Sequence, residues 1–174
     1  MGREVRMVPP DWEHPKKFND YTRKLEFIPL MDGFEVANTK WCEARDKWAE
    51  GFIEQWNLNA PSTWKPKGPD HEGMPFEEYE GSQPLAEDYM PSWPTSERTH
   101  FQMYEDTSEG TPISPIFATA EELARWLADT GASSFAAMTA SYEAWLNLIL
   151  SGSASISMVM VDGKIINGVE AQMK

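Results

Sequence analysis

The sequence has 174 residues, of which 41% are hydrophobic, enough for one domain with its own core. Its formal net charge of −13 disfavours direct binding of DNA or RNA. The single cysteine, Cys42, excludes an internal disulfide and fits a reducing compartment, and no apolar run is long enough for a membrane span. We therefore predict a single domain over residues 1–174 that works in the cytoplasm without contacting a membrane.

The first third of the chain predicts two short strands and one helix. Residues 3–8 alternate polar and apolar side chains and stop at Pro9-Pro10, which indicates an edge strand. A second extended piece is expected over residues 25–30. Aromatic and small apolar residues then recur every three or four positions and predict a helix over residues 38–56, with Gly51 as a mild interior flaw: Trp41, Ala44, Trp48, Phe52 and Trp56.

Residues 57–99 contain seven prolines, so long regular elements are not expected there. The same stretch carries six large apolar anchors, which is too many for a solvated linker. We predict an ordered but irregular acidic segment that wraps the core. Long loops of this kind are often functional.

The last third predicts strands and two helices. Residues 99–104 are expected to form a strand, and a capping box at Thr119 and Glu122 opens a helix that stops near Gly131. A further helix begins near Thr139, and Asp162-Gly163 between two apolar runs predicts a closing β-hairpin. The predicted fold class is α+β, with about three helices packed on a small, mostly antiparallel sheet.

The acidic charge is unevenly distributed, and this is the feature with functional content. Residues 68–109 carry eleven acidic side chains against Arg98 alone. Such a surface attracts basic proteins and repels nucleic acid. We predict that a basic protein binds there, through these acids and the aromatic residues among them: Glu77, Glu78, Glu80, Glu87, Asp88, Tyr89, Trp93, Glu105, Asp106 and Glu109. A surface that serves only solubility is the competing interpretation.

Catalytic and metal sites have weaker support, and the sequence favours a binding protein over an enzyme. The loop from Glu105 to Gly110 offers three carboxylates and two hydroxyls, which hard cations accept as ligands, but its spacing does not fit an EF-hand. A small metal-dependent enzyme that uses this loop, with His100 nearby, is an alternative. No phosphate-binding loop or nucleophile elbow is present, so no cofactor is predicted.

Several segments resemble uncharacterised proteins encoded by tailed bacteriophages and prophages. They are residues 3–9 (REVRMVP), 11–16 (DWEHPK), 88–91 (DYMP), 104–115 (YEDTSEGTPISP) and 121–129 (EELARWLAD). The resemblance covers most of the chain and implies a phage origin and action inside the bacterial cytoplasm. It implies no catalytic residues.

The main functional hypothesis combines the resemblance with the charge. It is a phage accessory protein that binds a basic host or phage protein, one of nucleic-acid handling or defence, through its acidic surface, as an inhibitor or a mimic of nucleic acid. A structural or assembly protein of the virion is a second alternative. The sequence contains no repeat or long coiled coil that would favour it.

Overall fold

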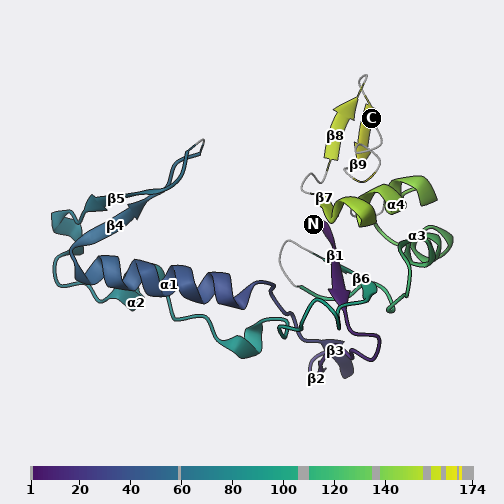
Figure 1. Ribbon diagram of the computed structural model, residues 1–174, viewed down its shortest axis with the longest axis horizontal. Coiled ribbons are helices and arrows are strands. Elements are labelled where there is room, and N and C mark those ends of the chain that lie inside the picture. The colour runs from purple at the N-terminus through teal and green to yellow at the C-terminus, as the bar shows by residue number, and fades with distance from the viewer. Residues whose placement is uncertain are drawn as a thin grey trace. The chain divides into compact units, whose positions relative to one another are not determined.

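The computed structural model (Figure 1) describes residues 2–58, 60–105, 110–134, 138–154, 158–161, 164–167 and 169. The chain forms two compact units. We call Met1–Leu30 with Pro91–Lys174 the split unit, and Met31–Met90 the inserted unit. Both contain helices and small antiparallel sheets, which confirms the α+β class. That the whole chain is a single domain stays a prediction.

The sheet of the split unit has β1 (Arg3–Val8) in its centre. β6 (His100–Glu105) pairs with it antiparallel on one side and β7 (Ser153–Ala154) on the other. Both longer strands lie where the sequence predicts them. The prediction that residues 3–8 form an edge strand is wrong, because β1 has a strand on each side. Its second partner, β7, is only two residues long and lies about 150 residues later in the sequence, so no local pattern predicts the pairing.

Two helices, α3 (Ala120–Asp129) and α4 (Tyr142–Ser151), pack together and bury one face of this sheet. The core includes fully buried side chains from β6 and both helices: Met103, Leu123, Leu127, Trp145 and Leu148. The predicted capping box is confirmed, with Thr119 and Glu122 each bonded to the other's backbone amide. Gly131 follows the helix with a φ of 63°, the left-handed conformation that ends helices.

Two hairpins complete the split unit. β2 (Lys16–Asn19) pairs with β3 (Lys24–Phe27), which ends three residues before the predicted extended piece does. β8 (Met158–Val161) pairs with β9 (Lys164–Asn167), which confirms the predicted closing hairpin. The turn residues 162–163 lie outside the described residues.

The inserted unit is built on α1 (Phe34–Ala49). It also contains the hairpin of β4 (Phe52–Gln55) and β5 (Thr63–Pro66), the short helix α2 (Phe76–Glu80) and two 3-10 turns at Pro69–His71 and Ala86–Asp88. Its core is a small cluster of four buried side chains: Trp41, Trp48, Ile53 and Phe76. The expected irregular, proline-rich segment therefore has short elements but no long one.

The boundaries of the first helix differ from the prediction. α1 begins four residues before Asn38 and ends at Ala49, so its predicted extension to Trp56 is wrong. Gly51 has a φ of 93°, which a helix does not accommodate, and the chain turns there into β4. The aromatic spacing continues through Phe52 and Trp56, but these side chains belong to the hairpin and its loop.

Candidate functional site

Five exposed carboxylates of the inserted unit form what we call the acidic strip: Glu77, Glu78, Glu80, Glu87 and Asp88. The first three belong to α2, and the last two to the 3-10 turn at Ala86–Asp88. All five are among the residues that the sequence predicts as a partner-binding surface. Residues 81–85, which include Pro84, separate α2 from the 3-10 turn in the sequence, and both elements belong to the inserted unit.

Phe76 fixes the orientation of α2. It is buried against the rings of Trp41 and Trp48, with centroids 5.0 and 5.9 Å away. The indole of Trp41 donates a hydrogen bond to the carbonyl of Gly81 at 3.1 Å, and Gln83 donates to Asn38 at 2.8 Å. Because one side of this short helix is held against α1, the glutamates on its other sides project into water.

The other end of the strip is held by backbone bonds near the start of α1. Met31 donates to the carbonyl of Asp88 at 2.9 Å and accepts from Met90 at 2.7 Å. Tyr89 is buried and packs edge-on against Phe34. The segment after α2 thus runs back along α1, as Figure 1 shows.

None of the five carboxylates has an ion-pair partner within 4 Å in the part of the chain that the structure describes. Arg45 interacts electrostatically with Glu77, but it is bonded to Asp46 at 2.9 Å. That bond raises the pKa of Arg45, with smaller contributions from Cys42 and Glu77. Since the inserted unit has thirteen acidic and five basic side chains, the negative field of the strip is not neutralised locally.

The remaining predicted partner-binding residues are placed differently. Trp93 is half-buried in the split unit, 4.8 Å from the ring of Trp12. Glu105 ends β6 and forms an ion pair with the buried Arg3 at 3.2 Å. Asp106 and Glu109 lie outside the described residues. The structure therefore places five of the predicted acids on two elements of the inserted unit, and it gives Glu105 a partner within its own sheet.

The metal-dependent alternative finds no assembled site in the described residues. They contain no group of three or more His, Cys, Asp or Glu side chains that could hold a metal ion. His100 and Glu105 stand at opposite ends of β6, which separates their backbones by roughly 16 Å. His100 therefore does not lie beside Glu105, and the other two acids of the loop lie outside the described residues.

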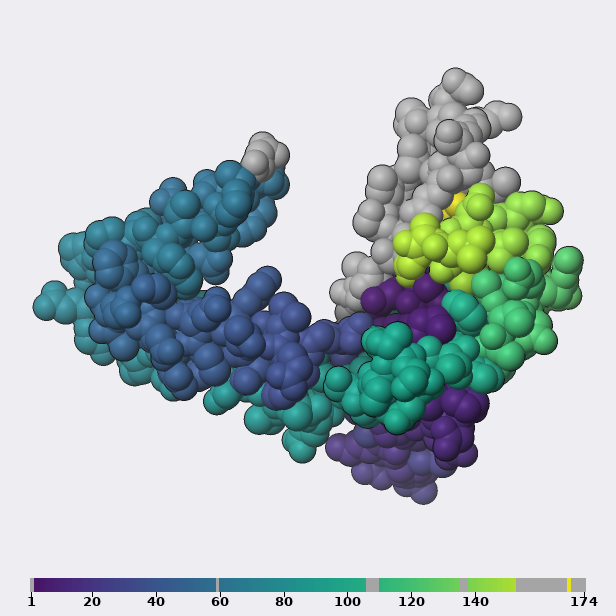
Figure 2. Space-filling model, viewed as in Figure 1, coloured from purple at the N-terminus to yellow at the C-terminus, as the bar shows by residue number. Residues whose placement is uncertain are grey.

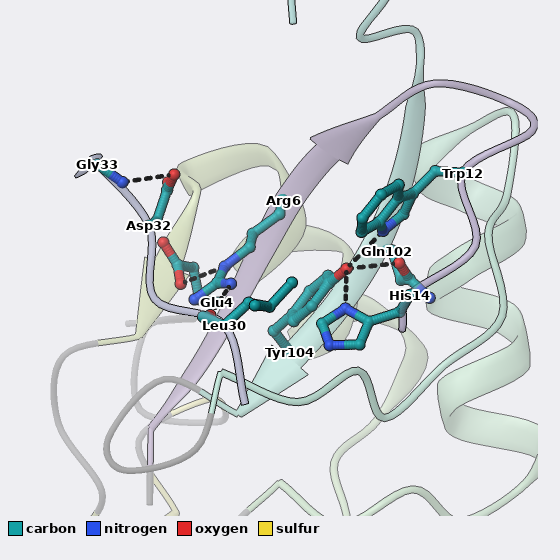
Figure 3. A network of polar contacts seen from close by, with 9 residues as sticks. All are labelled: Glu4, Arg6, Trp12, His14, Leu30, Asp32, Gly33, Gln102 and Tyr104. Atoms are coloured by element: carbon teal, nitrogen blue, oxygen red, sulfur yellow. Dashed lines mark hydrogen bonds and ion pairs between the residues drawn. The ribbon is translucent and has the colours of Figure 1, made fainter. Parts of the chain in front are cut away.

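A buried polar network in the split unit is a feature that sequence analysis misses (Figure 3). The hydroxyl of Tyr104 donates to Gln102 at 2.7 Å and accepts from the indole of Trp12 at 3.3 Å. His14 lies with Nδ1 3.3 Å from the same hydroxyl and with Nε2 2.7 Å from the carbonyl of Ile28. The participants come from separate segments, so no spacing motif reveals them.

The electrostatics of this network indicate a structural role. Burial raises the pKa of Tyr104 to about 12, although the Trp12 hydrogen bond and Arg6 oppose this. Burial lowers the pKa of His14, against the raising effect of the Ile28 carbonyl. Arg6 lies over the Tyr104 ring at 4.5 Å and donates to the carbonyl of Leu30 at 2.7 Å. Both the phenol and the imidazole are thus neutral near pH 7. The neutral imidazole donates from Nε2 to the Ile28 carbonyl, and the single hydroxyl proton of Tyr104 serves either Gln102 or Nδ1 of His14.

Comparisons with protein-family models, with curated proteins and with solved structures found no match. Among the described residues, none of the helices has the length and apolar character needed to traverse a bilayer.

Proposed function

We propose that this protein binds a basic protein through the acidic strip and acts as a phage accessory protein in the bacterial cytoplasm. The observation that carries the proposal is the set of five exposed carboxylates without ion-pair partners, held along α1 by a packed aromatic residue and by backbone hydrogen bonds. The phage setting is supported by the sequence resemblance.

The charge of the strip supports mimicry of nucleic acid. Each strand of a DNA duplex presents about one negative charge per 3.4 Å of axis, and a phosphate-binding groove is basic. The strip offers such a groove five carboxylates in two groups, three on α2 and two on the 3-10 turn at Ala86–Asp88. The strip is framed by secondary structure, so little conformational entropy is lost when it binds. We therefore expect the partner to be a nucleic-acid-handling or defence protein whose phosphate-binding groove is blocked.

The experiment is affinity capture from host lysate with three purified forms of the full chain. One is the wild type, and the second neutralises the strip with Glu77→Gln, Glu78→Gln, Glu80→Gln, Glu87→Gln and Asp88→Asn. The third changes the same number of exposed acids in the split unit: Asp11→Asn, Glu13→Gln, Asp20→Asn, Glu97→Gln and Glu143→Gln. The two variants have equal net charge, so a difference between them reports the strip itself.

We expect wild type and the split-unit variant to capture the same basic partner at low salt, and the strip variant to lose it. Raising the salt to about 0.5 M should release the partner, because screening weakens exposed charge pairs. The purified partner should then lose its nucleic acid in a competition assay when wild type is added. Equal capture by all three forms, or capture that ignores salt, would contradict the proposal.

A further inference from the structure

A groove of 780 Å³ lies beside α3 in the split unit. Its lining combines half-buried apolar side chains, notably Phe117, Trp126 and Tyr142, with the exposed carboxylates of Glu121 and Asp129. The groove is shallow and largely open to solvent, so it suits a protein segment better than an enclosed small molecule. No residue of the acidic strip lines this groove.

The net charge of the groove lining is −2, from Glu121, Glu122 and Asp129 against Arg125. The guanidinium of Arg125 lies over the Tyr142 ring at 4.1 Å, and Glu122 is bonded into the capping box. Glu121 and Asp129 form no ion pair with any described residue, and eight helical positions separate them by about 12 Å along α3. A ligand that fits would have apolar side chains between two cations at a similar distance.

The β2–β3 hairpin of the same unit has this character. Its register places Lys16 opposite Phe27, and Phe18 opposite Leu25, so these four side chains share one face. Phe18 is 48% and Leu25 66% exposed, although such residues are normally covered. In Figure 2 the hairpin belongs to the purple lobe at the lower edge of the split unit, where no other segment covers it on the face shown.

The cations of the hairpin frame this apolar face. Lys16 lies over the Phe27 ring at 4.6 Å and Arg23 over the Phe18 ring at 5.9 Å. Arg23 stands one position beyond the Asn19–Lys24 pair, so the two cations are separated by about 13 Å along the hairpin. Residues 16–27 have a net charge of +2 in a chain of −13.

We propose that the β2–β3 hairpin of one copy of this chain docks in the α3 groove of a second copy. Phe18 and Leu25 would cover Phe117 and Trp126, while Lys16 and Arg23 pair with Glu121 and Asp129. The hairpin and α3 lie on different parts of the same unit (Figure 1), so the contact joins unlike surfaces, either twice in a two-fold pair or once per copy in a ring or chain. This inference does not rest on the acidic strip and adds self-assembly to the proposed function.

A second copy is favoured over nucleic acid as the occupant of the hairpin. The net charge of −13 opposes the approach of phosphate and of a second copy alike, so the choice depends on the local match, and residues 16–27 offer only four cations to a phosphate backbone. The groove, in contrast, matches the hairpin in both apolar surface and charge spacing. A hairpin covers only a small area, so we expect weak, salt-sensitive association in the micromolar range.

The test is a charge exchange followed by analytical ultracentrifugation of the full chain. One variant reverses the hairpin (Lys16→Glu, Arg23→Glu) and the other reverses the groove (Glu121→Lys, Asp129→Lys). We expect wild type to associate at low salt, and each variant alone to sediment as a monomer. An equal mixture of the two should associate again, because every hairpin then finds a groove of opposite charge. Far-UV circular dichroism checks that both variants are folded.

The control is Lys17→Gln with Lys24→Gln, which removes two charges from the opposite face of the hairpin and should leave association unchanged. A wild type that stays monomeric up to about 200 μM at low salt would overturn the proposal. So would a mixture that fails to associate, or loss of association in the strip variant instead of the groove variant. Binding of duplex DNA by monomeric wild type, abolished by the hairpin variant, would assign the hairpin to nucleic acid.

Discussion

Arg3 shows how a single residue ties distant parts of the split unit together. Its side chain is 2% exposed, the lowest value for a charged residue in the described chain. It donates to the carbonyl of Ser133 at 2.7 Å and to Glu105 at 3.2 Å. Burial lowers its pKa, which the charge and hydrogen bond of Glu105 oppose. The hydrogen bonds to Ser133 and Glu105 therefore compensate the cost of burying the Arg3 charge.

We predict that Arg3→Met lowers the free energy of unfolding by about 2–3 kcal/mol, because it leaves Glu105 without its partner. The value is below that of a fully buried pair, since Glu105 keeps partial access to water. Urea denaturation measures it. Arg98→Met, at an exposed position, should change stability by less than about 0.5 kcal/mol. Equal effects of the two substitutions would show that the buried pair contributes nothing.

His14 gives the protein a pH dependence with a defined sign. Because burial lowers its pKa in the folded state below the ordinary 6.5, the unfolded chain binds a proton more readily. The stability that the neutral His14 contributes is fully present above pH 6.5, and it is lost as the pH falls from 6.5 to the lowered pKa of the folded state. We predict that stability declines between pH 7 and 5, by at most about 1.4 kcal/mol per pH unit from this group. His14→Gln should flatten that part of the profile, and an unchanged slope would contradict the assignment.

At the scale of elements, the best predicted features are those encoded by adjacent residues. The capping box at Thr119 and the pairing of the last two strands require only local spacing, and the structure confirms both. α1 was harder to predict, because its aromatic period continues past the glycine that ends it. Gly51 looks like a minor flaw in a helix, yet its positive φ turns the chain into β4.

The capping box also makes a quantitative prediction. Thr119→Ala removes the side-chain acceptor of the Glu122 amide and should lower the free energy of unfolding by about 1 kcal/mol. Thr119→Asn should keep most of the stability, because asparagine is an equally good N-cap. Thermal unfolding of the wild type and the two variants measures the order of their stabilities. Equal loss in both variants would mean that the cap does not stabilise α3.

At the scale of the whole molecule, the sequence predicts where the acidic residues are concentrated, but not how they are divided between the inserted unit and the split unit. Residues 68–109 form one acidic stretch in the sequence, yet the structure assigns residues up to Met90 to the inserted unit and the rest to the split unit. The boundary depends on backbone bonds between Met31 and residues 88–90, which are far apart in the chain. Hence the strip is predictable in composition, whereas its extent depends on non-local pairing.

Two separate cores predict two separately measurable stabilities. The inserted unit has its own buried cluster around Phe76, and the split unit has one around Leu123. Phe76→Ala should cost about 3 kcal/mol, from lost burial and the cavity that remains. Because units with separate cores can open independently, we expect faster amide hydrogen exchange in α1 and unchanged exchange in β1 and β6.

Leu123→Ala provides the reciprocal measurement, with faster exchange in α3, α4 and β6 and unchanged exchange in α1. If both substitutions accelerate exchange throughout the chain, the two units unfold together and the single-domain prediction holds. If each effect stays within its own unit, the acidic strip is carried by a module whose opening is independent of the β2–β3 hairpin and the α3 groove. Binding through the strip and self-assembly through the hairpin could then be switched off separately, which the strip and hairpin variants test in the same preparation.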